Sequence, residues 1–233
     1  MSSVIELLRG ARPLPSPVEA SVRAWRARAR VAETEALART RFVVLDVETT
    51  GLNPRRDRLL SIGAVPIERL RLVPGEIFAV LLRNDAPLAR DNVVVHGLTP
   101  ARQAAGEPRA PALGRFLEFL GKSPCVAFHA GFDRAVLERA LRAELGVRLP
   151  NAWIDLAALA PALVPQARLD GGVLDDWLGH FGISVHARHD AVHDAFAAAE
   201  LFLMLLARAR ARGLTTIAQL RAEEHAYANR HRR

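Results

Sequence analysis

The chain is 233 residues long, half of its residues are apolar and its formal net charge is +7, so it can bury the core of one domain of ordinary size. No apolar run reaches the length of a membrane-spanning helix and no secretory leader is evident, so we expect a cytoplasmic protein without a membrane partner. The single cysteine, Cys125, excludes an internal disulfide framework and any zinc site built from several cysteines.

The positive charge is concentrated at the two ends of the chain. Residues 1–41 contain 8 Arg and 4 Glu, residues 207–233 contain 7 Arg and 2 Glu, and the region between them carries a net charge of −2. A slightly acidic centre between basic flanks suits a metal-binding catalytic body with a polyanion nearby. A compositional preference for arginine explains the same charge equally well, since Lys122 is the only lysine.

The first 41 residues predict a helical N-terminal extension. Ser3 and Glu6 fit a capping box for a short helix over 3–9, and three prolines between residues 12 and 17 mark a linker. A second helix is expected over 18–39, with an apolar stripe that packs on the domain or on a second copy of the chain. The alternative is a nucleic-acid contact through the arginines of this helix, which are Arg23, Arg26, Arg28 and Arg30.

From residue 42 the pattern predicts alternating strands and helices. Strands are expected at 42–47, 59–67, 76–82, 125–128 and 152–154. Helices are expected at 99–105, 110–120, 132–145, 156–163, 173–181, 190–211 and 215–228. The first three strands, with a hairpin at Pro74–Gly75, form an antiparallel meander, and the apolar fourth strand is central and buried. The fold class is α/β, with a mixed five-stranded sheet flanked by helices in a domain over 42–212 and a basic C-terminal helical tail over 213–233.

Two acids near the end of the first strand are candidate metal ligands. Asp46 and Glu48 are two residues apart, so their side chains point to the same face. Adjacent carboxylates repel each other, and a divalent cation with a preference for hard oxygen ligands, Mg²⁺ or Mn²⁺, relieves that repulsion. The glycine that follows, Gly51, breaks the strand and permits a close backbone approach. The alternative is an edge strand with solvated acids.

Three further residues lie where a site of this kind needs them. Asp133 starts the helix after the buried strand, although an acid at a helix N-terminus is also favoured by the helix dipole. Asp194 is an acid on a helix that is otherwise rich in Ala, Phe and Leu, and His189 precedes it at the helix entrance. A neutral imidazole at that point is suited to take a proton from water. The remaining acids near helix starts are interpreted as caps or solvated groups, namely Asp155, Asp175, Asp176 and Asp190.

Carboxylates, a histidine and no cysteine cluster together describe a two-metal hydrolase. The segment from Asp46 to Gly51, the pair Phe132–Asp133, and His189 with Asp194 resemble the DEDDh 3′→5′ exonucleases, which include the proofreading epsilon subunit of bacterial DNA polymerase III. The segment Val95–Thr99 is also similar to a part of that family. The resemblance covers about residues 42–206.

The resemblance implies an RNase H-like fold and a set of roles for individual residues. Asp46, Glu48, Asp133 and Asp194 would ligate two Mg²⁺ or Mn²⁺ ions, and His189 would be the general base. Water would attack the terminal phosphodiester of a 3′-terminal single strand, with DNA favoured, and release a nucleoside 5′-monophosphate. The substrate would contact Thr49, Gly51, Leu52, His96 and Phe132.

The chain departs from the family pattern at two points. The family usually has His-Asn-Ala before Phe-Asp, and this chain has Phe128-His129-Ala130-Gly131 there. The proofreading subunit also continues into a polymerase-binding segment with a clamp motif, which is not found in this sequence. We therefore expect a stand-alone or differently recruited exonuclease, with a second copy of the chain or a polymerase or repair partner binding through residues 1–41.

Three alternatives remain at the level of function. One is an exoribonuclease of the same family. Another is a phosphatase of the haloacid dehalogenase type, which requires an aspartate where Glu48 stands and a downstream lysine, for which only Lys122 is available. The last is a non-catalytic nucleic-acid-binding module, which would not need four converging carboxylates.

Overall fold

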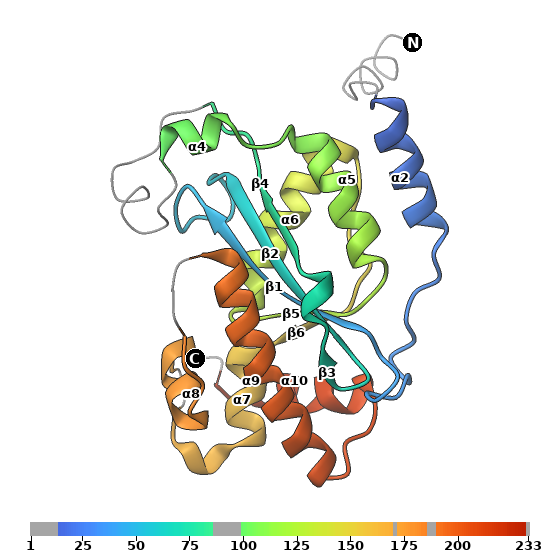
Figure 1. Cartoon of the computed structure of the whole chain (residues 1–233). Helices are drawn as coiled ribbons and strands as arrows, with labels where there is room; N and C mark the ends of the chain where they lie inside the picture. Colours follow the sequence, from blue (N-terminus) through green and yellow to red (C-terminus); the bar gives the residue numbers. More distant parts are fainter. Residues whose placement is uncertain (1–13, 86–98, 170–171, 186–189, 232–233) are drawn as a thin grey trace, which may run out of the picture.

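The computed structural model describes residues 14–85, 99–169, 172–185 and 190–231, and within them helices cover both faces of a mixed sheet (Figure 1). The six strands of this part of the chain are β1 (Phe42–Thr49), β2 (Leu59–Glu68), β3 (Arg71–Leu72), β4 (Phe78–Leu81), β5 (Cys125–Ala127) and β6 (Trp153–Asp155). Their order is β3-β2-β1-β5-β6, and β4 pairs with β2. β1 is therefore central, with an antiparallel neighbour in β2 and a parallel neighbour in β5.

The predicted antiparallel meander is present, because β2 pairs with both β1 and β4. The described sheet has one strand more than expected, since β3 returns along β2 after a tight turn at Arg69 and Leu70, whose φ angles are 50° and 60°. The predicted hairpin at Pro74–Gly75 is wrong, because these residues begin a 3₁₀ helix, η1 (Pro74–Glu76). Proline fixes its own φ and suits the start of a helix, whereas the actual turn uses two residues that give no turn signal.

The helices from residue 99 onward lie close to their predicted positions. The α-helices of the described residues are α2 (Ser16–Ala27), α4 (Pro100–Ala104), α5 (Arg109–Leu120), α6 (Ala130–Leu145), α7 (Leu156–Leu163), α8 (Leu174–Phe181), α9 (Ala191–Ala211) and α10 (Ile217–His231), and a second 3₁₀ helix is η2 (Pro165–Ala167). The helix predicted over 3–9 lies outside the described residues. None of the described helices combines the length and the apolar character needed to cross a membrane.

The helix predicted over 18–39 is wrong at its carboxyl end, because α2 stops at Ala27. The chain that follows is held against the domain instead. The backbone N–H of Leu37 donates to the carbonyl of Thr215 at 2.8 Å, and Ala36 forms a β-bridge with Thr216. The bridge at Ala36 is flanked by turns at 33–34 and 37–39, so these contacts with the segment before α10 override the helical pattern of the sequence.

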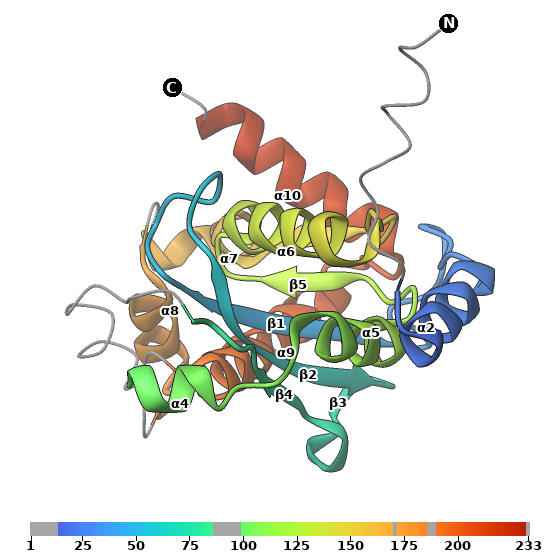
Figure 2. The same ribbon diagram turned by 90° about the horizontal axis from the view of Figure 1, so that it is seen from above.

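The apolar stripe of α2 packs on the domain, which is one of the two possibilities predicted for it; the other was packing on a second copy of the chain. Val18, Val22 and Trp25 are buried with side chains of α5, and Figure 2 shows the two helices side by side. The indole N–H of Trp25 donates to the carbonyl of Gly121 at 2.7 Å. A partner that binds through this segment would therefore have to use the exposed face of α2.

The alternation of residues along β1 divides the core between the two faces of the sheet. Val43 and Leu45 pack with α2, α5 and α6 on one face. Phe42 and Val44 pack with α7, α8, α9 and α10 on the other face. β5 is buried along its whole length between β1 and β6, which confirms the central buried strand predicted there. The face that carries α9 is also the face of the even-numbered positions of β1, which include Asp46 and Glu48.

One carboxylic acid of α10, Glu224, is buried. Glu224 is 8% exposed, and its Oε2 has no hydrogen-bond partner among the described residues. Burial raises the pKa of Glu224 to about 7, and the negative charge of Asp155 adds to the effect, while the backbone N–H of Asp155 opposes it. Because this folded-state pKa lies above the ordinary value of 4.5, the protonated acid stabilises the fold most at low pH.

We expect Glu224→Gln to abolish a pH-dependent part of the stability. The stabilisation is complete below about pH 4.5 and is lost as the pH rises through 7, and the loss is about 3 kcal/mol when 1.36 kcal/mol is counted for each pKa unit. Urea unfolding across this range measures the difference between wild type and variant. Glu19→Gln, at an exposed position, is the matched control. If the free energy of unfolding depended on pH in the same way in Glu224→Gln and in Glu19→Gln, the expectation would be contradicted.

Candidate metal centre and active site

β1 places two carboxylates at the middle of the sheet. Its residues are buried along almost the whole strand, because helices cover both faces, and Asp46 is only half-buried while Glu48 is 7% exposed. In the register with β2, Asp46 lies opposite Gly63 and Glu48 lies opposite Ser61. Both acids therefore point to one face, as their spacing predicted, and α9 packs on that face.

A glycine in β2 allows α9 to come close to this face. A Cβ atom at Gly63 would lie 2.1 Å from the carbonyl oxygen of Ala191, which is far inside van der Waals contact. Only a residue without a side chain can lie there, so the first turn of α9 rests directly on the backbone of β2. The helix start is also fixed by Asp190, whose carboxylate accepts the backbone N–H groups of Val192 and His193.

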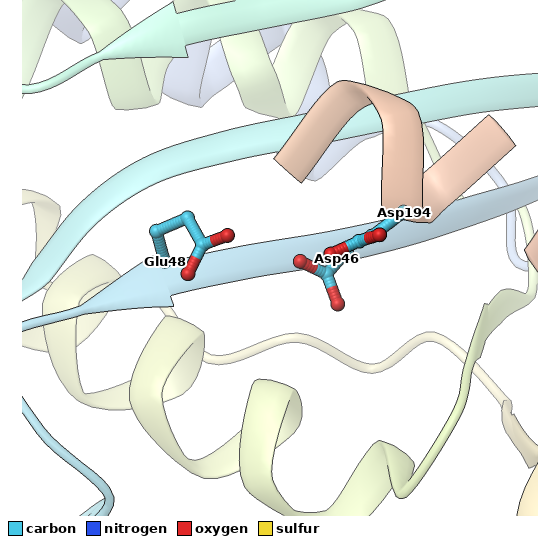
Figure 3. Close-up of side chains that lie close together, drawn as sticks. All are labelled: Asp46, Glu48 and Asp194. Atoms are coloured by element: carbon cyan, nitrogen blue, oxygen red, sulfur yellow. The ribbon is translucent and has the colours of Figure 1, made fainter. Parts of the chain in front are cut away.

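This close packing brings Asp194 over β1. Asp194 lies in the first turn of α9 and is 6% exposed. One carboxylate oxygen each from Asp46, Glu48 and Asp194 can be chosen so that all three lie within 4.8 Å of one another. Figure 3 shows the first two side chains on β1 and the third reaching them from a turn of α9. Residues almost 150 positions apart in the sequence thus form one cluster, as predicted.

The three carboxylates fit a divalent cation. Three partly or fully buried acids with carboxylate oxygens within 4.8 Å of one another carry a repulsion that proteins relieve by protonation or by a bound cation. Carboxylate oxygens without sulfur or imidazole among the described members of the cluster are the donor set of Mg²⁺ and Mn²⁺. The donor chemistry therefore supports the expected class of metal.

The fourth predicted acid, Asp133, lies beside the cluster and not within the group of three. It is in the first turn of α6 and 4% exposed, and its Oδ1 accepts the backbone N–H of Val47 at 3.2 Å. Burial raises the pKa of Asp133 to about 8; the charges of Asp155 and Glu48 raise it further, and backbone hydrogen bonds oppose the shift. Asp133 is thus held against the part of β1 that carries the other two acids.

The loop after β1 is fixed by its own hydrogen bonds. The hydroxyl of Thr49 donates to the carbonyl of Gly51, and the hydroxyl of Thr50 accepts the backbone N–H of Arg58 at 2.9 Å. A Cβ at Gly51 would lie 2.6 Å from a carboxylate oxygen of Asp57, so this position has room only for glycine unless the Asp57 side chain moves. The compact loop holds its exposed tip in a defined place.

The predicted substrate contacts differ in their accessibility. Leu52 is 92% exposed on the loop after β1, whereas Thr49 is buried. Phe132 is partly buried against the core in the first turn of α6. His96 and the predicted general base His189 lie outside the described residues.

The substitution of His129 for the usual asparagine falls at a position with an unusual backbone. His129 has φ 59° and ψ 46°, in the left-handed region, and its N–H donates to Asp155 Oδ1 at 2.9 Å. Asparagine and histidine are among the residues that tolerate this conformation best. The backbone requirement is therefore met by either residue, although their side chains differ.

Two acids that sequence analysis interpreted as caps have that role. Asp155 caps α7 by accepting the N–H of Ala157, and Asp190 caps α9. Gly63 is not among the residues that the sequence pattern predicted for the site. A glycine inside an apolar strand pattern signals a bulge or a close backbone approach, so this residue could have been identified from the sequence.

The family of the chain follows from comparison with known proteins. Residues 43–202, more than half of the chain, match the family model named RNase_T, which is described as an exonuclease. The chain belongs to this exonuclease family. The matched region contains all four predicted metal ligands, Asp46, Glu48, Asp133 and Asp194.

Curated relatives of this exonuclease are named as parts of DNA polymerase III. A DNA polymerase III subunit epsilon-like protein of Rhodobacter capsulatus is 37% identical over 196 residues, which are 83% of this chain and 27% of the relative. A PolC-type DNA polymerase III of Thermotoga maritima is 30% identical over 77% of this chain and 13% of the relative. The epsilon subunit of Treponema pallidum is 30% identical over 71% of this chain and 76% of the relative. The chain therefore spans only a small part of the first two proteins.

Solved structures agree with the predicted fold. E. coli exonuclease I in complex with a dT13 oligonucleotide has a TM-score of 0.62 and 20% identity, over 74% of this chain and 42% of that chain. A zinc-bound complex of E. coli exonuclease I with single-stranded DNA also has a TM-score of 0.62, with 22% identity, over 73% of this chain and 41% of that chain. This exonuclease has the RNase H-like fold that the sequence resemblance implied.

We expect Gly63→Ala to disturb the acid cluster without removing any acid. The added methyl group would push the first turn of α9 off β2 and move Asp194 away from its two partners. Displacement of a catalytic group by about 1 Å costs about 100-fold in rate, and overpacking costs about 1–3 kcal/mol of stability. Calorimetric titration with Mn²⁺ measures metal binding, nuclease assays measure the rate, and urea unfolding measures the stability.

Gly75→Ala is the matched control for this change. A Cβ at Gly75 meets nothing within 4 Å, so this variant should retain metal binding and activity. If Gly63→Ala bound Mn²⁺ as tightly as Gly75→Ala, the proposed dependence of Asp194 on the close packing would be wrong.

Proposed function

We propose that this exonuclease is a metal-dependent enzyme that removes nucleotides from the 3′ end of single-stranded DNA and releases nucleoside 5′-monophosphates. The observation that carries the proposal is the meeting of Asp46, Glu48 and Asp194 within 4.8 Å in a chain of the exonuclease family. A 3′→5′ direction and a preference for DNA are consistent with relatives that are named as polymerase III epsilon subunits and with fold neighbours solved with DNA oligonucleotides.

The acids would hold two Mg²⁺ or Mn²⁺ ions. When bound, such ions lower the pKa of an attacking water and stabilise the leaving oxygen of an in-line displacement. Asp46 and Glu48 hold their positions because β1 is central and paired on both sides. Asp133 would complete the set from α6, and its hydrogen bond to Val47 N–H fixes it next to β1. His189 would take the proton from the attacking water.

The terminal nucleotide would lie on the loop that follows β1. An unpaired base offers an apolar face to a side chain such as Leu52, which is 92% exposed directly beyond the acids in the sequence. Thr49 and Gly51 would shape the pocket beneath the sugar, with Phe132 and His96 as further contacts. Because an apolar wedge recognises no particular base, we expect hydrolysis to be largely independent of sequence.

The alternatives drawn from the sequence have less support. The lysine that a haloacid dehalogenase-type phosphatase needs would be Lys122, which precedes β5 and lies over the ring of Trp25, near the start of β1 and not near its acids. The family match argues against this class and against a non-catalytic module. An exoribonuclease would use the same acids, so matched DNA and RNA oligomers decide between these two substrates.

We expect Glu48→Gln and Asp194→Asn to lose more than about 100-fold in activity, because the loss of a metal ligand exceeds the 10- to 100-fold effect typical of groups that merely orient ligands. The assay is the shortening of a 5′-labelled single strand to a ladder with Mg²⁺ or Mn²⁺, and chelation with EDTA should stop it. Glu19→Gln, at an exposed position of α2, is the control. A 5′-labelled strand that gave a mononucleotide at once would contradict the 3′→5′ direction.

We expect His189→Ala to slow hydrolysis by about 10²–10⁴-fold, the usual contribution of a positioned general base. The acidic limb of the pH–rate profile should flatten, because the imidazole that must be neutral is gone. His193→Ala is the matched control, because the His193 Nδ1 lies at hydrogen-bond distance, 3.0 Å, from Asp190 Oδ1. An unaltered pH–rate profile in His189→Ala would remove His189 from this role.

A further inference from the structure

A second group of charged side chains lies around Lys122, away from the acid cluster. Lys122 follows α5 and precedes β5, on the side of the molecule where α2 and α5 pack together (Figure 1). Cys125 of β5 pairs with Val43 in a parallel register, so Lys122 lies beyond the amino-terminal end of β1. Asp46 and Glu48 lie toward the opposite end of the same strand.

The side chains in this region line a hollow of 270 Å³ between the end of α2, the α5–β5 turn and the segment after α6. None of the described residues that line it is acidic. Its cations are Arg26, Arg28, Arg30, Lys122 and Arg148. We refer to this cavity, with the five cations that line it, as the basic hollow.

These cations are crowded, and no acidic side chain in the described part of the chain forms an ion pair with them. The Nζ of Lys122 lies 3.0 Å from the ring centroid of Trp25, and burial lowers the pKa of Lys122 to about 8, with the charges of Arg30, Arg28 and Arg26 acting in the same direction. Arg30 and Arg148 form no hydrogen bond or ion pair with any residue that the structure describes.

Two of the arginines are held in place by the backbone. Arg26 donates to the carbonyl of Gly146 at 3.3 Å, and Arg28 donates to the carbonyl of Glu118 at 3.0 Å. Neither contact neutralises a charge. Preorganised cations without a counter-charge are arranged to receive an anion from outside the chain.

We propose that the basic hollow binds phosphate groups of nucleic acid, as a second contact for the strand whose 3′ end is cleaved. This proposal rests on the nucleic-acid substrate of the proposed function. Arginine predominates in the hollow, and its planar guanidinium binds phosphate in a bidentate manner. The binding would lengthen the contact between enzyme and polymer without taking part in the chemistry.

The surroundings favour a phosphate backbone over unpaired bases or an acidic protein. The aromatic rings near Lys122 are already covered, since Lys122 lies over Trp25 and Arg41 lies 4.9 Å from the ring centroid of Phe119. Trp25 is 3% exposed, so it cannot stack on a base. A protein interface normally has an apolar or aromatic centre, whereas this hollow offers mainly charge. Binding should therefore be independent of sequence.

The location also sets a length requirement. From Phe42 to Glu48 a strand extends for about 20 Å at roughly 3.3 Å per residue. A nucleic acid that reaches from the acids to the basic hollow must span at least that distance. A dinucleotide cannot do so, which gives a substrate that tests the catalytic centre alone.

The test is the double variant Arg30→Gln/Arg148→Gln in the full chain. Binding of a fluorescent single strand of about 30 nucleotides is measured by anisotropy in EDTA, over about 50 to 300 mM NaCl. We expect the affinity near 0.1 M salt to fall roughly 10- to 30-fold and the slope of log K against log salt to decrease by about 1.4, because each lost phosphate contact contributes about 0.7 on single strands. With Mg²⁺, hydrolysis of a dinucleotide should be unchanged.

The matched control is Arg208→Gln/Arg210→Gln, which removes the same charge from exposed positions of α9. Circular dichroism and thermal unfolding establish that both double variants fold. If the two variants bound the oligonucleotide equally well, the basic hollow would not be a nucleic-acid site, and binding of inorganic phosphate or of an acidic peptide there would then identify a different occupant.

The two proposals can fail separately. Loss of oligonucleotide binding in EDTA by Arg30→Gln/Arg148→Gln supports the basic hollow even if no hydrolysis is detected with any metal. Metal-dependent hydrolysis of the dinucleotide supports the catalytic centre even if the variant binds the long strand like wild type, which would overturn the basic hollow.

Discussion

The candidate site depends on one close contact, the approach of the α9 backbone to β2 at Gly63. Strand pairing alone fixes Asp46 and Glu48, because both lie on the central strand. Asp194 comes from the far end of the sequence, and its position depends on how closely a helix can pack on a sheet. The absence of a side chain at Gly63 brings the backbone of α9 into contact with that of β2, and the helix cap at Asp190 sets where the first turn begins. Packing and capping together thus place a third charge beside two others.

This exonuclease has two clusters of charged side chains, one acidic and one basic. Acids lie toward the carboxyl-terminal end of β1 and at the start of α9, and cations lie beyond the amino-terminal end of the same strand. Each cluster by itself is electrostatically unfavourable, since like charges in partly buried places destabilise one another. On the functions proposed here, a metal ion would offset one and a polyanion would offset the other. A nucleic acid with bound divalent ions carries both kinds of counter-charge, so the unfavourable electrostatics of the free protein would favour formation of that complex.

Much of the fold and of the acid cluster could be predicted from the sequence. The period-2 placement of Asp46 and Glu48, the apolar strand at Cys125 and the periodicity of α5 to α10 are local signals, and the structure confirms them. The errors arose where tertiary contacts decided the outcome. α2 ends at Ala27 because the following residues hydrogen-bond to the segment before α10. The turn at Arg69 and Leu70 adopts left-handed angles without glycine or asparagine. The separation of Asp133 from the group of three acids reflects a side-chain hydrogen bond to Val47, which no pattern in the sequence encodes.

The contact between Leu37 and Thr215 joins two segments that the sequence presents as separate extensions. Leu37 is 1% exposed, and its amide is satisfied only by a carbonyl that lies just before α10. An ion pair between Glu33 and Arg221 links the same two regions. The amide of Ile217, which is 1% exposed, donates in turn to the carbonyl of Glu35. Removal of either segment, 33–37 or 215–221, would therefore leave a buried amide of the other unpaired, at about 1–3 kcal/mol. The segment after α2 and the segment that leads into α10 thus hold each other in place, and the loss of one would loosen the other.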